Sequence, residues 1–314
     1  MRQRVVIAGG AGFIGYHLAK RLTQEGSAVV ILDNFATGTR RNASDLERPD
    51  ICQVIAHDVC DPITVQGPVD YVVNLACPAS PVDFTRVPIE IMRVCSEGTL
   101  NLLELALHKG ATFVQASTSE VYGDPEVHPQ EESYTGNVNI NGPRSVYDEG
   151  KRYAEALSTA YARKYRLPVR IARIFNTYGP RMRADDGRVV SNFIVRALQG
   201  RPLELYGGGQ QTRSFCYVSD LVDGLIRLAN SEAEGPVNLG NPAEFTVAEL
   251  AGLILDMTGS AAGTIESPML HRDDPKRRCP NITRARELLG WNPQVSLRKG
   301  LESCIPWFRE CIGD

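Results

Sequence analysis

The chain has 314 residues, a formal net charge of -3 at pH 7, and a composition that is 43% hydrophobic and 23% charged. The absence of a basic excess argues against a nucleic-acid or anionic-membrane surface and favours small molecules as partners. No uninterrupted apolar run approaches the ~20 residues that a membrane helix needs. We therefore expect a soluble protein with one or two domains.

The eight cysteines are scattered, and no two have the Cys-x-x-Cys spacing of a zinc or redox pair. This distribution predicts reduced thiols, no bound metal and a cytoplasmic location.

Short apolar runs alternate with longer helical patterns in the first half of the chain. This alternation is typical of βαβ units and predicts an α/β fold, a Rossmann-type doubly wound parallel sheet covered on both faces. We expect strands at Val5–Ala8, Ala28–Leu32, Gln53–Ala56, Tyr71–Leu75, Thr112–Ala116 and Val169–Ile174, and helices at Phe13–Gln24, Ile89–His108 and Tyr147–Tyr165.

The pattern changes after about residue 175, where glycine and proline clusters interrupt shorter elements. We predict a dinucleotide-binding domain over residues 1–174, with returning segments near 212–240. Residues 175–314 then form mainly a smaller, interleaved C-terminal α/β lobe for the substrate.

Three glycines, Gly9, Gly12 and Gly15, follow the first expected strand and open the first helix. Glycines there allow a tight turn, backbone approach to a pyrophosphate and close helix packing, and the helix N-terminus favours negative charge. A glycine pattern alone is weak evidence, but its position between strand and helix indicates a dinucleotide site.

Asp33 follows the second strand, where a carboxylate can accept hydrogen bonds from the adenosine ribose, and its charge favours NAD over NADP. Arg40 and Arg41 are the counter-argument, because guanidinium groups can accommodate a 2′-phosphate. Asp58 is a candidate partner of the adenine amine, or else it only caps the following turn. Phe13, Ile14, Asn34 and Leu75 complete the expected cofactor-binding set.

Tyr147 and Lys151 lie four residues apart and therefore on one face of the third helix. We expect the ammonium group of Lys151 to lower the pKa of the Tyr147 phenol, so that the phenol can act as a base. The preceding strand ends in hydroxyl residues at the edge where such sheets bind ligands, and Thr118 is placed to orient a substrate hydroxyl. The alternative is a surface tyrosine and a solvated lysine.

These motifs together resemble the extended short-chain dehydrogenase/reductase family of nucleotide-sugar enzymes over nearly the whole chain. Seven segments resemble UDP-glucuronate decarboxylases in particular: "STSEVYGDPEVHPQ", "GPRSVYDEGKR", "RIFNTYGPRM", "DGRVVSNFI", "QTRSFCYVSDLVDG", "PVNLGNP" and "DDPKRRCPNI".

The resemblance implies a redox cycle with no net redox change. Tyr147 deprotonates the sugar 4-hydroxyl of UDP-glucuronate while NAD takes the hydride, carbon dioxide leaves the resulting 4-keto sugar, and returned hydride completes UDP-xylose. Lys151 and Thr118 assist Tyr147, Glu120 handles water or a proton near C5, and Arg278 addresses the substrate carboxylate. A solvated charge in "DDPKRR" is the alternative for Arg278.

Related activities remain as alternatives. A UDP-sugar 4-epimerase, for example one acting on UDP-glucuronate, shares every step except the loss of carbon dioxide. A 4,6-dehydratase needs an acid before the family glutamate, and this chain has Ser119 there, which is no general acid at neutral pH. A non-catalytic dinucleotide sensor would need no Tyr/Lys pair.

The same resemblance also implies which residues bind the nucleotide part of the substrate. Arg213 and Asn176 match residues that bind the diphosphate, Arg188 is a further substrate-binding candidate, and Tyr206 matches an aromatic residue that stacks on uracil. A core position is the alternative for Tyr206. Relatives are commonly homodimers built through their long helices, which predicts a homodimer here.

Four positions depart from the family pattern. Cys95 stands where relatives usually have asparagine, and "YTGNVNINGPRS", with Thr135 and Asn141, replaces "YWGNVNPIGPRS". We expect these changes to lie near the sugar pocket, where they bear on the identity of the substrate more than on the reaction type.

Overall fold

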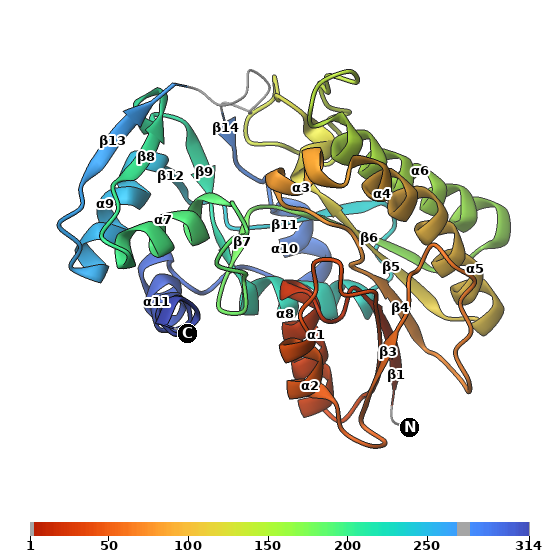
Figure 1. The fold of residues 1–314 in the computed structure, drawn as a ribbon. Helices are drawn as coiled ribbons and strands as arrows, with labels where there is room; N and C mark the ends of the chain where they lie inside the picture. The colour runs from red at the N-terminus through yellow and green to blue at the C-terminus, as the bar shows by residue number, and fades with distance from the viewer. Residues whose placement is uncertain (1–2, 269–276, 314) are drawn as a thin grey trace.

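The computed structural model describes residues 3–268 and 277–313. Within these ranges the largest sheet has seven parallel strands in the order β11-β6-β5-β4-β1-β2-β3, which confirms the predicted doubly wound fold (Figure 1). Its strands are β1 (Arg4–Ala8), β2 (Ala28–Asp33), β3 (Cys52–Ala56), β4 (Tyr71–Asn74), β5 (Thr112–Thr118), β6 (Val169–Ile174) and β11 (Pro236–Leu239).

Helices cover both faces of this sheet, because neighbouring strand residues point to opposite sides. Val5 and Ile7 pack with α1 (Phe13–Gln24) and α8 (Val218–Ala229), whereas Val6 and Ala8 pack with α5 (Thr99–Lys109) and α6 (Ser145–Tyr165). Helices α2 (Arg40–Leu46), α3 (Pro81–Arg86) and α10 (Thr283–Leu289) complete this half. The unbroken apolar character of the strands follows from this double burial.

The helix expected at Ile89–His108 is not a single α-helix. It consists of α4 (Pro88–Arg93), a π-helical turn at Val94–Gly98, and α5. The backbone keeps right-handed helical angles across both junctions, so periodicity alone could not reveal the change. Such π turns often occur at functional sites, and this one faces α6.

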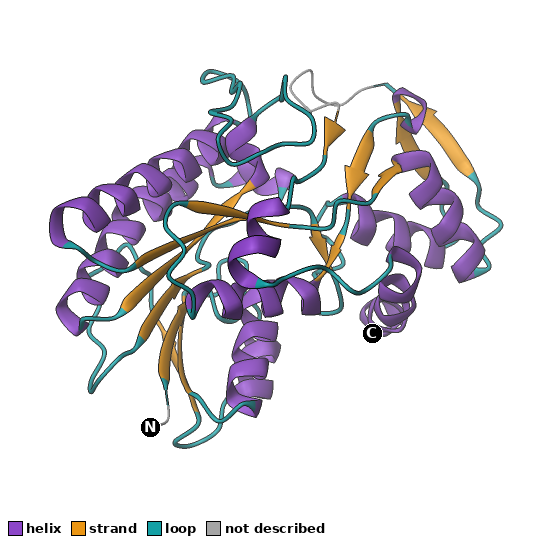
Figure 2. Ribbon diagram, turned by 180° about the vertical axis from the view of Figure 1, so that it is seen from behind, coloured by secondary structure: helices purple, strands orange, loops and turns teal. Residues whose placement is uncertain are grey.

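The smaller lobe, which Figure 2 shows from behind as a ribbon, has a hydrophobic core of its own. It is built from α7 (Val189–Leu198), α9 (Val247–Thr258) and α11 (Leu297–Gly313). The short strands β8 (Leu203–Tyr206) and β13 (Thr264–Ser267) pair with each other, and β9 (Thr212–Ser214) lies between β12 (Glu244–Thr246) and β14 (Arg277–Arg278). Strands β7 (Thr177–Tyr178) and β10 (Cys216–Tyr217) form a further pair.

The chain crosses between the two cores more than once. After β9 and β10 it returns to the large sheet as α8 and β11, and β11 pairs with β6 in parallel. We keep the division into residues 1–174, with returning segments near 212–240, and 175–314 as a proposal. Of the sequence motif at residues 273–278, only Arg277 and Arg278 lie within the described ranges. No described helix is both long enough and apolar enough to cross a membrane.

Candidate active site

A cavity of about 1390 Å³ lies at the carboxyl edge of the large sheet and extends to residues of the smaller lobe. Every residue that the sequence places in the site lines it. These are Gly9, Gly12, Phe13, Ile14, Gly15, Asp33, Asn34, Asp58 and Leu75 for the cofactor, Thr118, Glu120, Tyr147, Lys151 and Arg278 for catalysis, and Asn176, Arg188, Tyr206 and Arg213 for the substrate. The binding and catalytic roles of the individual residues remain predictions.

The glycine turn between β1 and α1 leaves no room for side chains. Gly9 has φ +76°, and a Cβ there would lie 2.8 Å from the backbone nitrogen of Ala76. A Cβ at Gly15 would lie 2.7 Å from Gly10 Cα. Gly12 caps α1, so the first amides of this helix face the cavity as an anion site for the pyrophosphate of a dinucleotide.

Asp33 ends β2 and is held by backbone amides. Its Oδ2 accepts from Ala11 N at 2.9 Å and its Oδ1 from Phe35 N at 2.8 Å. Burial raises the pKa of this carboxyl, and the two amide hydrogen bonds oppose that rise. Carboxylate oxygens keep further lone pairs for ribose hydroxyls.

Asp58 caps the turn that follows β3 and also lines the cavity. Its Oδ1 accepts from Cys60 N at 2.9 Å, which is the turn-capping bond, while its Oδ2 accepts from Asn34 Nδ2 at 2.9 Å. Burial alone would raise the pKa of Asp58, but these hydrogen bonds lower it overall. The side chain also lines the cavity, so the turn role and an adenine role are compatible.

Arg40 and Arg41 do not line the cavity. The guanidinium of Arg40 lies over the Phe35 ring, 4.6 Å from its centroid. Arg41 pairs with Glu310 and lies 4.9 Å from the Trp307 ring centroid. Neither guanidinium is therefore placed beside Asp33 for a 2′-phosphate.

Tyr147 and Lys151 are both buried on the first turns of α6 and face the end of β5. Lys151 Nζ donates to Ala116 O at 3.0 Å and lies 5.8 Å from the centroid of the Tyr147 ring. The Tyr147 hydroxyl is hydrogen-bonded to Thr118. The predicted contacts among Tyr147, Lys151 and Thr118 are all present, so the surface alternative is wrong.

The predicted lowering of the Tyr147 pKa is wrong as a net effect. Burial raises this pKa most, Lys151 offsets only part of the rise, and the resulting value is about 12. Sequence spacing identified the lysine but not the desolvation, which comes from side chains elsewhere in the chain. Phe84, from α3, stacks on the Tyr147 ring with 4.9 Å between centroids. Lys151 has a raised pKa despite its burial, because Cys77 and Tyr147 favour its charged form.

Glu120 lies between two arginines. It forms a two-pronged ion pair with Arg278, in which Nη2 and Oε2 are 2.6 Å apart, and a second pair with Arg144. Burial would raise its pKa, but Arg278 and Arg144 outweigh burial and hold it at about 2. The alternative of a solvated Arg278 is wrong, since its side chain is only 6% exposed.

Arg144 was not identified as a site residue from the sequence, although it lies in the quoted segment "GPRSVYDEGKR". It lies one residue before α6, and the closeness of its guanidinium to Glu120 depends on the fold of the intervening loop. Its position shortly before Tyr147 was the available signal.

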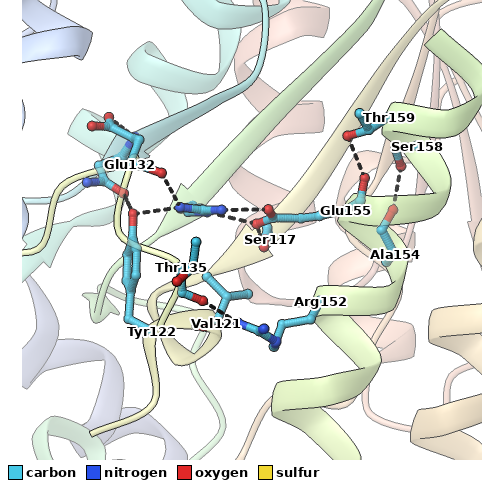
Figure 3. A network of polar contacts seen from close by, with 12 residues as sticks. Ser117, Val121, Tyr122, Glu132, Thr135, Arg152, Ala154, Glu155, Ser158 and Thr159 are labelled. Carbon is cyan, nitrogen blue, oxygen red and sulfur yellow. Dashed lines mark hydrogen bonds and ion pairs between the residues drawn. The ribbon is translucent and has the colours of Figure 1, made fainter. Parts of the chain in front are cut away.

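A partly buried network beside the site holds the short helical segment Ser119–Tyr122 in place (Figure 3). Arg173 Nη1 donates to the Tyr122 hydroxyl and to Glu132 O, each at 3.0 Å, and its Nε and Nη2 donate to Glu155 at 3.0 and 2.9 Å. Arg152 Nη1 donates to Val121 O at 2.9 Å. The network joins β6 and α6 to this segment and thereby positions Glu120.

The four residues expected to hold the substrate come from separate elements of the cavity wall. Asn176 follows β6, and its carbonyl accepts from Cys216 N at 2.9 Å. Arg188 pairs through both prongs with Asp186, and Arg213 on β9 is buried. The Tyr206 hydroxyl donates to Glu204 at 3.1 Å, and its half-buried ring lines the cavity, so it is not a core residue.

Cys95, Thr135 and Asn141 do not line the cavity, although the Cys95 sulfur lies 3.7 Å from the sulfur of Cys77, which does. Their effect on the identity of the substrate stays a prediction. Thr135 O accepts from Arg152 at 2.7 Å, and Asn141 is exposed. Cys95 is buried against α6, where a Cβ at Gly150 would lie 3.1 Å from its sulfur. Loop length and turns place Thr135 and Asn141 outside, which position in sequence could not show.

Residues 5–240 match the family described as "NAD dependent epimerase/dehydratase family". The chain belongs to this family. The match confirms NAD as the predicted cofactor. It agrees with the glycine turn at the start of α1 and with Asp33 at the end of β2.

Individual relatives within this family give a more specific comparison. The chain is 53% identical over 309 residues to UDP-glucuronic acid decarboxylase 2 of Arabidopsis thaliana, covering 98% of this chain and 69% of the relative. It is 51% identical to UDP-glucuronic acid decarboxylase 1 of Xenopus tropicalis, covering 98% and 73%. These relatives confirm the resemblance to UDP-glucuronate decarboxylases.

A similar solved structure carries the name of an epimerase rather than a decarboxylase. UDP-glucuronic acid 4-epimerase of Bacillus cereus, in complex with UDP-glucuronic acid and NAD, is 26% identical, with a TM-score of 0.87 and coverage of 98% of this chain and 99% of that chain.

Proposed function

We propose that this protein is a UDP-glucuronate decarboxylase that forms UDP-xylose without net oxidation or reduction. The observation that carries the proposal is the meeting of two groups in one cavity, the Thr118/Tyr147/Lys151 set and the Glu120–Arg278 pair. The relatives that are about half identical over nearly the whole chain bear the same name.

NAD fits the glycine turn, the start of α1 and Asp33, and when bound it supplies the hydride acceptor and donor together with a positive charge. Burial holds Tyr147 as a neutral phenol at neutral pH. The ammonium of Lys151 favours the phenolate, so an additional positive charge nearby acts in the same direction. Tyr147 then takes the proton from the sugar 4-hydroxyl and later returns it.

Thr118 holds the oxygen on C4 by a hydrogen bond, because its hydroxyl lies beside that of Tyr147. Together the two hydroxyls stabilise the negative charge that develops on this oxygen as carbon dioxide leaves. The C6 carboxylate is then β to a ketone, which is the arrangement that loses carbon dioxide readily.

Arg278 binds the C6 carboxylate in this proposal and exchanges part of its pair with Glu120 for the substrate. Glu120, with a pKa of about 2, is ionised at neutral pH and serves as an acceptor that orients water near C5. Asn176 and Arg213 bind the diphosphate, Arg188 is a further substrate-binding residue, and Tyr206 stacks on uracil.

The alternative favoured by a specific observation is a UDP-glucuronate 4-epimerase, since the solved structure named above shares the fold over nearly the whole chain. A 4,6-dehydratase is less suitable because Ser119 is no general acid. The test is to incubate purified protein with NAD and UDP-glucuronate and to determine the mass of the product. A product lighter by one carbon dioxide supports decarboxylation, and an isobaric product contradicts it.

We also propose a homodimer in the cytoplasm. The helices expected to pair carry exposed apolar side chains, Ile89 (65% exposed), Met92 (40%) and Leu100 (40%) on α4 and α5, and Tyr153 (51%) on α6. None of the eight cysteines is in a disulfide, which suits a reducing compartment. Light scattering should give twice the chain mass, and Ile89→Glu should shift it toward one chain mass; a monomeric parent protein would contradict the dimer.

A further inference from the structure

Two cysteines meet beneath the catalytic turn of α6. Cys77 lies three residues after β4 and lines the cavity, where it is partly exposed. Cys95 lies in the π-helical turn and is 2% exposed. Their sulfur atoms are 3.7 Å apart and in hydrogen-bond contact, although the residues are 18 positions apart in the sequence.

A small movement separates this contact from a covalent bond. The S–S distance of a disulfide is about 2.05 Å, and the two sulfurs already touch at 3.7 Å. Cys77 stands on an irregular segment and Cys95 on a π turn rather than in a regular α-helix. Closure therefore needs side-chain rotation together with a shift of these segments.

The surroundings give the two sulfurs different reactivity. The hydrogen bond from Cys95 lowers the pKa of Cys77 most, and the positive charge of Lys151 lowers it further. The same hydrogen bond, together with burial, raises the pKa of Cys95 well above its ordinary value. A thiolate is the nucleophilic form of cysteine, and Cys77 lines the cavity, where a small oxidant can reach it, whereas Cys95 is only 2% exposed. We therefore take Cys77 as the attacking sulfur and Cys95 as the resolving one.

We propose that Cys77 and Cys95 form a peroxide-sensitive thiol pair that closes to a disulfide and thereby lowers turnover at the active site. The effect on turnover rests on the proposed function, whereas formation of the disulfide does not.

The oxidant is hydrogen peroxide, and the reaction balances in two steps. The Cys77 thiolate attacks one peroxide oxygen, the O–O bond breaks, and the departing hydroxide takes a proton to leave as water. Cys95 sulfur then attacks the Cys77 sulfenic acid, the S–O bond breaks, the S–S bond forms, and the hydroxyl leaves with the Cys95 proton as a second water. The thiols lose two electrons and the peroxide gains two.

Formation of the disulfide affects Tyr147 and Lys151 through the contact between Cys95 and Gly150. This glycine stands on α6 between Tyr147 and Lys151, and the Cys95 side chain fills the space beside it, with Sγ 3.1 Å and Cβ 3.2 Å from a Cβ built there. Moving Cys95 removes packing beneath this turn. The disulfide also removes the ionisable Cys77 thiol, whose negative charge, when it forms, favours the charged form of Lys151. A displacement of 1 Å at a reacting group can cost about 10²-fold in rate.

The experiment starts from fully reduced full-length protein treated with a small excess of hydrogen peroxide, which catalase then removes. Non-reducing peptide mass analysis should find the Cys77 and Cys95 peptides joined, with the intact mass lower by two hydrogens. Turnover should fall at least ~10-fold, consistent with a sub-ångström to 1 Å displacement, and dithiothreitol should restore it. Prior addition of NAD should slow closure, because Cys77 lines the cavity.

Cys95→Ser tests the resolving role, and Cys60→Ser is the matched control, because Cys60 also lines the cavity. Each variant is compared with its own reduced form. In Cys95→Ser, peroxide should join no Cys77 peptide to the peptide that contains position 95, and no loss of turnover should arise from a disulfide at this place. Cys60→Ser should respond like the parent protein.

Unjoined Cys77 and Cys95 peptides in peroxide-treated parent protein would overturn the proposal, and a joined peptide with unchanged turnover would overturn its effect on catalysis. If the reduced protein releases no carbon dioxide, the proposed function fails, while the joined peptide still decides whether the thiol pair exists.

Discussion

Helix α6 carries Tyr147, Lys151 and Glu155 at intervals of four residues, and these residues serve two different polar clusters. The cavity cluster contains Tyr147, Lys151, Thr118, Glu120 and Arg278, all of which line the cavity. The enclosed cluster contains Glu155, Arg173, Tyr122 and Glu132, none of which lines it. Both rely on a two-pronged arginine–glutamate pair, buried in the first and mostly buried in the second.

The difference between the clusters lies in what the arginine can exchange. Arg173 has partners fixed on three sides, so it has no role for a ligand and holds β6, α6 and the Ser119–Tyr122 segment together. Arg278 faces the cavity, where a substrate carboxylate can compete with Glu120. The same pair of side chains therefore stabilises the fold in one place and, we propose, binds substrate in the other.

The largest expected effect is on stability, from Arg173→Met. Breaking a buried ion pair by removing one partner costs about 3–5 kcal/mol, and Glu155, whose side chain is only 13% exposed, would be left without its partner. Urea unfolding should show this loss. Arg170→Met is the matched control on the same strand, since Arg170 donates to the Ser231 and Val169 carbonyls; a loss equal to that of Arg173→Met would refute the special position of the enclosed cluster.

The next effect is on turnover, from Tyr147→Phe. Removing a general acid-base group costs at least ~10²-fold, which is about 2.7 kcal/mol of activation free energy. The phenyl ring keeps its stacking on Phe84, so the free energy of unfolding and NAD binding should change little. Tyr153→Phe, at an exposed position of the same helix, should leave turnover unchanged. An active Tyr147→Phe protein would remove this residue from the chemistry.

Glu120→Gln should separate two steps of the reaction. Loss of charge-assisted hydrogen bonds worth about 1.5–3 kcal/mol should slow decarboxylation by at least ~10-fold, with less effect on ketone formation. Trapped 4-keto sugar and stalled NADH absorbance measure the two steps. Glu155→Gln is the comparison in the enclosed cluster and should lower stability more than turnover. Equal slowing of both steps by Glu120→Gln would argue against its late role.

A further effect, spread gradually over the acid pH range, is a pH dependence of stability that arises from Asp148. Burial, followed by the charge of Glu120, raises the pKa of this carboxyl to about 7, and its buried Oδ1 has no hydrogen-bond partner among the described residues. Between pH 3.8 and about 7 the folded protein holds a proton that the unfolded chain releases, so this contribution to stability falls as the pH rises.

Urea midpoints measured across that range should show a shallower decline in Asp148→Asn than in the parent protein. Glu149→Gln controls for the loss of one carboxylate at the same helix end. Glu120 acts in the opposite direction: its stabilisation is lost as the pH falls from 4.5 toward about 2. Identical slopes for Asp148→Asn and the parent protein would rule out the Asp148 contribution.

Local sequence patterns correctly predicted the features that depend on residues close together in the sequence. The six expected strands agree within two residues at each end, because apolar runs bounded by turns mark doubly buried strands. The spacing of Tyr147 and Lys151 predicted their contact on one helix face. The glycine turn was readable for the same reason, since strand, turn and helix are contiguous.

Other features required the fold. The pKa of Tyr147 depends on burial against Phe84, which comes from a distant helix, so spacing alone gave the wrong net direction. Glu120 and Arg278 are 158 positions apart, and only family resemblance linked both to the site. The Arg173–Glu155 pair and the Cys77–Cys95 contact involve no recognisable motif, and only the packing of β6, α6 and the π turn brings them together.

The most direct test of the central claim follows one hydrogen atom. UDP-glucuronate carrying deuterium at C4 is incubated with the protein and NAD, and the product is analysed by mass spectrometry and NMR. The account predicts UDP-xylose that has lost carbon dioxide and keeps deuterium at C4, with no lasting accumulation of NADH. A product that retains its carboxylate, or one whose C4 deuterium has been lost to solvent, would contradict it.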